Sequence, residues 1–442
     1  MKDLTKGFPA KVIILFAIPL MIGNIAQQLY NITDSKIVSL YVSSNSLAAV
    51  GATGVVSNLL TSLIIGLTQG FGIVISQYFG AKDMKNLRRY VFGIFVLTTF
   101  FSVLLMSIGL STVVPMLKLL GTPSDIMTDA VTYLHIILVG VIFIAFYNMS
   151  ANLLRAVGDS KSPLYCLFAS IIINIILDLV FIRVFHLGIG GAAYATIIAQ
   201  FICAALCTII LFVKTKVIIP SRNEFDLMPI EYRKLLTFGF AMGLMGCIVN
   251  LGSVILQTSI NGLGTTVVVA HTAARRVLDI IMVMVYTTGF AMTTYSSQNY
   301  GAGEIKRIKQ GIIHAVIIDT IISTVLVIWT YIFGTNVVGW VASSQNPEIL
   351  LNGELYLKIS VVFFYVLGPL FIFRCSLQGM GAKSTPLITS VMELIVKILS
   401  VKFLVPRIGY KGVALTEPIS WVIMTVVLFI GVVVTLNKHL KA

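Results

Sequence analysis

Long apolar segments separated by short polar ones dominate the chain. A membrane-spanning helix takes about 20 apolar residues at 1.5 Å rise each, and twelve runs bounded by charges, glycines or prolines are long enough. They cover residues 12–34, 46–79, 89–112, 126–154, 163–184, 190–213, 233–259, 266–299, 307–333, 348–378, 386–405 and 411–436. The runs lack the alternation of a membrane β-barrel. The pattern therefore predicts an all-α integral membrane protein with twelve transmembrane helices.

Composition supports this interpretation. Hydrophobic residues make up 57% of the 442 positions and charged residues only 11%, whereas a soluble protein carries about 25% charged residues. The mean hydropathy is +0.98, too high for a surface exposed to water. The five cysteines lie inside apolar runs, and neither they nor the five histidines show metal-ligand spacing. No nucleophile–base pattern appears either, so we expect a protein that is not an enzyme.

Positive charge is distributed unevenly between alternate loops. With twelve spans both termini lie on one side, which carries 21 Lys and Arg residues, among them Lys2, Arg222 and Lys441. The opposite loops carry 6, namely Lys36, Lys118, Arg183, Lys402, Arg407 and Lys411. Because Lys and Arg are enriched on the cytoplasmic side, we expect both termini in the cytoplasm. The net charge of +14 is scattered rather than gathered on one domain face, which argues against nucleic acid as a partner.

Two halves of the chain repeat one design. "SQYFGAKDMKNLRR" at 76–89 matches "SQNYGAGEIKRIKQ" at 297–310, and "AVGDSKSP" at 156–163 matches "GMGAKSTP" at 379–386. The last stretch is not a phosphate-binding loop, because Ala382 separates Gly381 from Lys383. The repeat predicts two six-helix lobes related by a pseudo-two-fold axis along the membrane normal. We place the N-lobe at 1–213, a cytoplasmic linker at 214–232 and the C-lobe at 233–442.

Ionisable residues inside the predicted helices are the candidates for chemistry, because each costs about 2.5–3.5 kcal/mol on insertion scales. The acids are Asp34, Asp178, Asp279, Asp319, Glu393 and Glu417. Asn174 precedes Asp178 by about one turn, so both project from one helix face. Thr196 on the next helix has a comparable depth. This all-oxygen set suits a hard cation or a shared proton. The alternative is that Asp34 is interfacial and Asp178 pairs with Arg183.

The paired lobes, the S-Q-x-x-G-A ending of the second helix and "NLLRAVGDSKSP" after the fourth together resemble the MATE (multidrug and toxic compound extrusion) family. "PLMIGNIAQQLYNITDSKIVS" at 19–39 and "NIILD" at 174–178 are most similar to its bacterial DinF-type branch. The resemblance implies an N-lobe cation site at Asp34, Asn174, Asp178 and Thr196 that binds H⁺ or Na⁺, with no other cofactor. It also implies that the helix-1 bend predicted at Pro19 is linked to protonation of this site.

Other polar residues are candidates for a substrate cavity. Gln27 and Tyr30 lie on the same helix face as Asp34, and Asn152 lies on the fourth helix. Arg275 and Asp279 have the spacing of an i,i+4 ion pair, with either a structural or a cavity role. In the C-lobe, helix 7 has no acid, and helix 10 has only Glu354, near its outer end, apart from Glu348 at its first position. We therefore expect no sodium site of the NorM-like kind there.

These observations favour a secondary active antiporter in the cell (inner or plasma) membrane. We expect a monomer that exports small-molecule drugs or organic compounds, cationic or amphiphilic, in exchange for H⁺ or Na⁺. The first alternative is a flippase for lipid-linked saccharides from the same superfamily, which Arg275 and Arg276 would suit. The second is a membrane-embedded enzyme or channel. No Walker motif is present, which argues against an ATP-driven pump.

Overall fold

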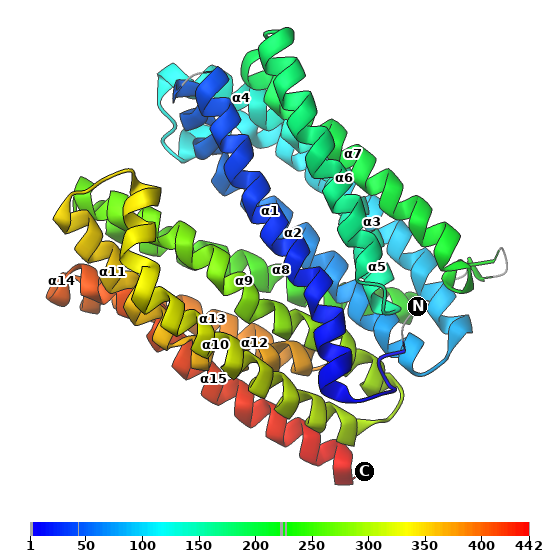
Figure 1. Ribbon diagram of the computed structural model, residues 1–442. Helices are drawn as coiled ribbons and strands as arrows, with labels where there is room; N and C mark the ends of the chain where they lie inside the picture. Colours follow the sequence, from blue (N-terminus) through cyan, green and yellow to red (C-terminus); the bar gives the residue numbers. More distant parts are fainter. Residues whose placement is uncertain (1–2, 43, 222–223, 226–227, 442) are drawn as a thin grey trace. The chain divides into compact units, whose positions relative to one another are not determined.

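A computed structural model describes residues 3–42, 44–221, 224–225 and 228–441 (Figure 1). Of the cationic residues used to predict orientation, Lys2 and Arg222 lie outside the described residues, as does the side chain of Lys441. The described chain is helical throughout, with no strand assigned in these ranges. This confirms the predicted fold class.

Nine helices in the described residues are long and apolar enough to cross a membrane. They are α1 (Pro9–Tyr41), α2 (Ser44–Gly80), α3 (Met84–Leu119), α6 (Lys161–Asp178) with the π-helix η1 (Leu179–Val184), α7 (Gly188–Lys214), α8 (Pro229–Asn261), α9 (Thr265–Gly301), α10 (Ile305–Ala342) and α15 (Tyr410–Lys441). Several run past the predicted limits. In particular, α1 continues for two turns beyond the predicted end at residue 34, so Asp34 is an interior residue of its helix.

Two further spans are bent pairs rather than the single helices predicted for 126–154 and 348–378. The helices α4 (Ser124–Val139) and α5 (Val141–Ala156) bend by 41°, and α11 (Pro347–Val362) and α12 (Phe364–Gly379) bend by 51°. In the first pair, Gly140 lies at the break, and a side chain there would overlap Ile197. In the second, Pro369 follows the break and cannot donate a hydrogen bond to the carbonyl of Tyr365.

The eleventh predicted span, 386–405, is interrupted. It consists of α13 (Ser384–Leu399), the π-helix η4 (Ser400–Leu404) and α14 (Val405–Ile408). The π-helices η1 and η4 begin 221 residues apart, which is the offset of the sequence repeat. The duplication therefore extends to this uncommon element, which occurs often at functional sites.

The chain divides into two compact units. Unit 1 contains Ile22–Gly246, and unit 2 contains Asp3–Met21 together with Cys247–Ala442. Their boundaries differ from those of the predicted lobes, because the first parts of α1 and α8 each belong to the other unit. The lobes at 1–213 and 233–442, with a linker at 214–232, stay a prediction.

The shared helices pack tightly where they join each unit. In unit 2, Val12, Ile13 and Phe16 of α1 are part of the main hydrophobic core with residues of α9 to α12 and α15. In unit 1, the start of α8 lies against α2 with almost no space between backbones. A side chain added at Gly66 would come within 2.5 Å of the backbone of Gly243. Small residues permit such close helix approach in membranes.

Candidate functional site

The two acids of the predicted N-lobe site meet in unit 1. Asp34 lies on α1, and Asp178 is the last residue of α6, directly before the π-helix η1. Their carboxyl groups are within hydrogen-bonding reach of each other. Two carboxylates cannot donate a hydrogen bond, so a hydrogen bond between these groups forms only when one of them carries a proton. The pair is an arrangement suited to holding a single shared positive charge.

Asn174 connects the acids to the neighbouring helix. With its amide nitrogen turned toward the acceptors, it donates to Oδ2 of Asp178 at 2.9 Å and to the Tyr30 hydroxyl oxygen at 3.2 Å. Its carbonyl oxygen then accepts from the backbone N–H of Thr196 at 3.2 Å. The hydroxyl of Thr196 donates to the carbonyl of Ala192 at 3.0 Å and also lies beside Tyr30. The structure thus brings Tyr30, Asp34, Asn174, Asp178 and Thr196 together.

The site is buried and incompletely satisfied. The side chains of Asn174 and Asp178 are 1% and 0% exposed. One oxygen of Asp34 and one of Asp178, Oδ1 in each case, are buried without a hydrogen-bond partner. Behind them, Ile37, Val38, Ile182 and Ala192 form a small apolar cluster. Polar atoms left unpaired in an apolar setting are costly, so these oxygens are suited to receiving a proton or a small cation.

The alternative pairing of Asp178 with Arg183 does not occur. The guanidinium of Arg183 instead lies over the Tyr41 ring, 5.9 Å from its centroid. Among the described residues, no ion pair joins a lysine or arginine to Asp34 or Asp178. The acids are therefore not neutralised by a permanent basic partner.

Three other predicted residues lie elsewhere in the fold. Pro19 is inside α1, two residues before the boundary between the compact units. The Gln27 amide donates to Asn31 at 3.3 Å. Asn152 on α5 donates to the Thr68 hydroxyl of α2 at 3.3 Å and accepts from Arg155 at 3.4 Å. The structure thus gives Asn152 an interhelical contact, and its role in a substrate cavity stays a prediction.

A second polar cluster lies in unit 2. Arg275 donates to Asp279 at 2.8 Å, which confirms the i,i+4 pairing, and to Glu417 of α15 at 2.7 Å. Tyr356 of α11 donates to the other Glu417 oxygen at 3.3 Å. The Asp279 side chain is 41% exposed, whereas that of Glu417 is 8% exposed. On α13, Glu393 and Lys397 also form an ion pair, at 2.9 Å.

The structure adds residues that no sequence pattern indicated. Tyr133 of α4 lies close enough to Asp34 and Asp178 to interact with both charges. In unit 2, His271 contacts the Tyr410 hydroxyl at 3.2 Å beside Tyr356. These aromatic residues come from helices distant in sequence, and tyrosines in membrane helices are more often interfacial anchors. No spacing rule within one helix could have joined them to the acids.

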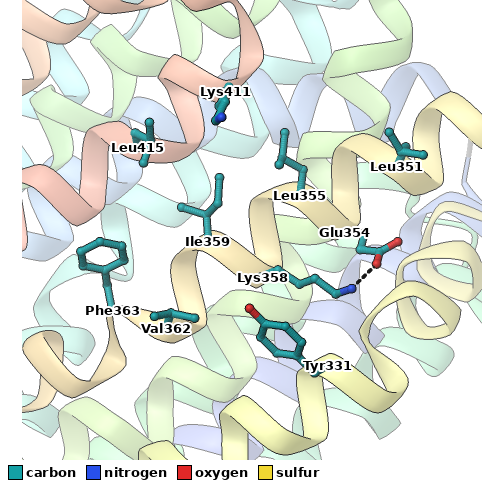
Figure 2. Close-up of a pocket in the computed structure, with 10 residues that line it drawn as sticks. All are labelled: Tyr331, Leu351, Glu354, Leu355, Lys358, Ile359, Val362, Phe363, Lys411 and Leu415. Atoms are coloured by element: carbon teal, nitrogen blue, oxygen red, sulfur yellow. Dashed lines mark ion pairs between the residues drawn. The ribbon is translucent and has the colours of Figure 1, made fainter.

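An open pocket of about 570 Å³ in unit 2 is separate from both clusters. Figure 2 shows it between Tyr331 of α10, the part of the chain from Leu351 to Phe363, and Lys411 and Leu415 of α15. Its walls are mainly aliphatic, and the ion pair of Glu354 with Lys358 closes one side. None of the predicted site residues lines it.

Comparison with known proteins agrees with these features. The MatE family model matches residues 19–180 and 241–401. The chain is 29% identical over 432 residues to the "Probable multidrug resistance protein YpnP" of Bacillus subtilis (strain 168), covering 97% of this chain and 96% of that protein. It is 23% identical over 421 residues to a "FAD transporter" of Shewanella oneidensis, covering 94% and 92%.

Solved structures show the same fold. A crystal structure of MATE in the bent conformation matches with a TM-score of 0.91 at 23% identity, covering 99% of this chain and 98% of that one. The likeness extends over the whole chain and includes both halves of the repeat. It confirms the helical membrane architecture predicted from the sequence.

Proposed function

Because the chain belongs to the MatE family, whose members are transporters rather than enzymes, we propose that it is a secondary active multidrug antiporter. It exports organic cations or amphiphilic compounds, and entry of a proton at the Asp34–Asp178 pair drives the export. The relative in Bacillus subtilis, named a probable multidrug resistance protein, supports this class of substrate. Membership in the DinF-type branch stays a prediction.

The contact between Asp34 and Asp178 carries the proposal. Two buried carboxyl groups with no basic partner can hold one shared proton, and loss of that proton leaves like charges facing each other. The unprotonated pair is therefore under strain until it takes up a cation or separates. Since Asp34 is on α1 and Asp178 on α6, separation requires a change in the position of α1. Protonation is thereby coupled to conformation.

The orientation of Asn174 favours H⁺ over Na⁺ as the coupling ion. Sodium would need oxygen ligands, but the Asn174 carbonyl accepts from the backbone of Thr196, and its nitrogen faces the acids. The Thr196 hydroxyl donates within its own helix. Two carboxyl groups beside amide and phenol donors suit proton exchange better than they suit a sodium ion.

Coupling then follows from differential binding. A proton can drive export only if it binds one conformation more tightly than the other. Asn174 of α6 holds the Asp178 side of the pair in place, whereas Asp34 and Tyr30 move with α1. In unit 2, the partly exposed Asp279 is the candidate binding residue for a cationic substrate. Its negative charge is partly neutralised by the ion pair with Arg275.

The direct test is proton-driven efflux of a cationic dye from membrane vesicles without added Na⁺. We expect Asp34→Asn and Asp178→Asn each to lower efflux at least about 10-fold, a change in barrier of about 1.4 kcal/mol. Asp125→Asn is the matched control, because Asp125 is an exposed residue in the first turn of α4. Normal proton-driven efflux by Asp178→Asn would contradict the proposed coupling. Efflux that instead requires Na⁺ would show that sodium, rather than the proton, is the coupling ion.

A lipid-linked saccharide flippase stays the main alternative, and the FAD transporter among the relatives also points to anionic cargo. Arg275, however, is neutralised by Asp279 and Glu417, which leaves Arg276 as the cationic residue available for such a ligand. We further propose that the protein is a monomer in the cell membrane with both termini in the cytoplasm. Labelling of single cysteines at residues 6 and 438 by an impermeant reagent tests this orientation.

A further inference from the structure

We propose that Asp319 of α10 is a second proton-binding site, located in unit 2 and separate from the Asp34–Asp178 pair. The observation is a fully buried carboxyl group that fits against Gly368 of α12 and has no ion-pair or well-formed hydrogen-bond partner among the described residues. The proposal concerns proton binding itself, so it does not depend on which compound the protein exports.

Asp319 lies well inside a long apolar helix. It is close to the middle of α10, which spans 38 residues, and its side chain is 0% exposed. Both carboxyl oxygens are buried without a hydrogen-bond partner. Ser323, one turn further along the helix, is the polar group nearest to it, and the Ser323 hydroxyl is itself unsatisfied. Asp319 therefore makes no ion pair or well-formed hydrogen bond among the described residues that would give it a structural role.

The neighbouring helix leaves room for this carboxyl group. Gly368 of α12 faces Asp319, and a methyl group at position 368 would overlap the carboxyl carbon and oxygens. Neighbours on both sides of Gly368, Leu367 and Leu370, are buried in the apolar core. The glycine thus forms a notch in an otherwise apolar wall, and the carboxyl group of Asp319 occupies it.

The charged side chains that are not exposed on the helices packed against α10 are committed to ion pairs, whereas Arg276 of α9 and Lys411 of α15 are exposed. On α9, α11 and α15, Arg275 binds both Asp279 and Glu417, and Glu354 binds Lys358. On α12, Arg374 lies 3.9 Å from Glu393, which also binds Lys397. No cation among the described residues is therefore committed to Asp319. Asp319 differs in this respect from Asp279, Glu393 and Glu417, the other intramembrane acids of unit 2.

A carboxylate in this position would be an isolated buried charge. Such a charge costs many kcal/mol and is avoided by protonation. The neutral acid loses only its hydrogen bonds to water, which is a far smaller penalty. In this conformation Asp319 therefore carries a proton.

The same surroundings provide a route for exchange of the proton. The break at Phe363, where α11 and α12 bend by 51°, precedes Gly368 by about one and a half turns. Pro369 directly follows Gly368 and leaves the Tyr365 carbonyl without its helical donor. A helix interrupted at two points around the notch can change shape there. Such a change would admit water to Asp319 and release its proton.

Infrared spectroscopy tests the site directly, because a protonated carboxylic acid has a C=O stretching band that a carboxylate lacks. The purified full-length protein carrying Asp34→Asn and Asp178→Asn has no carboxyl pair left in unit 1. We expect a residual acid band at neutral pH that shifts in D₂O and disappears when Asp319→Asn is added. In the same background, Asp279→Asn is the matched control and leaves the band unchanged, because Asp279 is ion-paired with Arg275.

Two outcomes would overturn the proposal: the absence of an acid band in the double variant, or a band that persists after Asp319→Asn. Gly368→Ala gives a second measurement, since the added methyl group displaces the carboxyl group from its notch and should shift the band. An unchanged band in a folded Gly368→Ala protein would also contradict the assignment. Dye efflux is measured separately, so failure of this site leaves the test of the Asp34–Asp178 pair unaffected.

Discussion

Asp34 and Asp178 lie on helices far apart in sequence, yet their carboxyl groups are within hydrogen-bonding reach of each other. Both belong to unit 1, and neither has a lysine or arginine partner among the described residues. An acid pair without a counter-charge is sensitive to every group that holds it in place. The consequences can be tested one residue at a time.

Asn174 is the residue whose loss should weaken the pair most selectively. Asn174→Leu keeps the volume but removes the donors to Asp178 and Tyr30 and the acceptor for Thr196. Each net hydrogen bond is worth about 0.5–1.5 kcal/mol, so we expect a clear fall in melting temperature and slower efflux. Asn148→Leu is the control, because the Asn148 amide bonds only the carbonyl of Ile144 in its own helix. Equal losses in the two variants would contradict a special role for Asn174.

Pro19 is expected to keep α1 adaptable. Pro19→Ala restores the backbone donor that proline lacks, and alanine is about 3 kcal/mol more favourable in a helix interior. We predict a higher melting temperature, slower efflux and unchanged dye affinity. Pro115→Ala makes the same exchange inside α3 and should change stability without slowing efflux. Full transport activity in Pro19→Ala would show that bending at this residue is not required.

The contact of α2 with α8 should not tolerate even one methyl group. In Gly66→Ala the new carbon would lie 2.5 Å from backbone atoms of Gly243, and backbone cannot rotate away as a side chain can. Overpacking typically costs about 1–3 kcal/mol, and we expect at least this loss in thermal unfolding. Gly54→Ala lies on the same helix with no atom within 4 Å of the added carbon. It should gain about 0.5–1 kcal/mol from helix propensity. A stable Gly66→Ala protein would mean that the helices are less tightly packed.

The segment after α7 should respond to acid through one ion pair outside the membrane spans. Arg88 donates to Glu224 at 2.8 Å, and this hydrogen bond lowers the pKa of Glu224 from 4.5 to about 2. A lowered folded-state pKa stabilises the fold above pH 4.5, and that contribution is lost as the pH falls toward 2. We predict a slightly lower melting temperature for Glu224→Gln at pH 7, because the pair is partly exposed.

The difference between Glu224→Gln and the unchanged protein should narrow as the pH falls from 4.5 to 2. Glu304→Gln is the control, because no ion pair involves Glu304 in the described residues. A difference that is constant across this pH range would rule out titration of Glu224 as the cause.

The sequence predicted most of the helices because each has a long apolar run with charges at its ends. It also predicted the pairing of Arg275 with Asp279, since residues four apart share one helix face. It could not predict the bends at Gly140 and Phe363. At the first bend, Gly140 lies close to Ile197, a residue distant in the chain, and one sequence does not reveal such a contact.

The candidate site shows the same limit. The spacing of Asn174 and Asp178 placed both on one helix face. The family resemblance then implied that Asp34 and Thr196 belong to the same cation site. Tyr133 escaped notice because only the packing of α4 brings it near the acids. The amide of Asn152 bonds Thr68 of α2, an interhelical contact that spacing did not predict, and its place in a cavity stays a prediction. Contacts between helices depend on their rotation about their own axes, which one sequence does not reveal.

The division of α1 and α8 has a mechanical consequence. Each is one continuous helix with its beginning anchored in one compact unit and its end in the other. A helix packed at both ends cannot rotate at one end without twisting, tilting or bending along its length. A movement of α1 at Asp34 is therefore expected to displace the apolar residues Val12, Ile13 and Phe16 near the start of the same helix. The second half of the duplicated chain repeats this arrangement, because α8 is divided between the two units as α1 is.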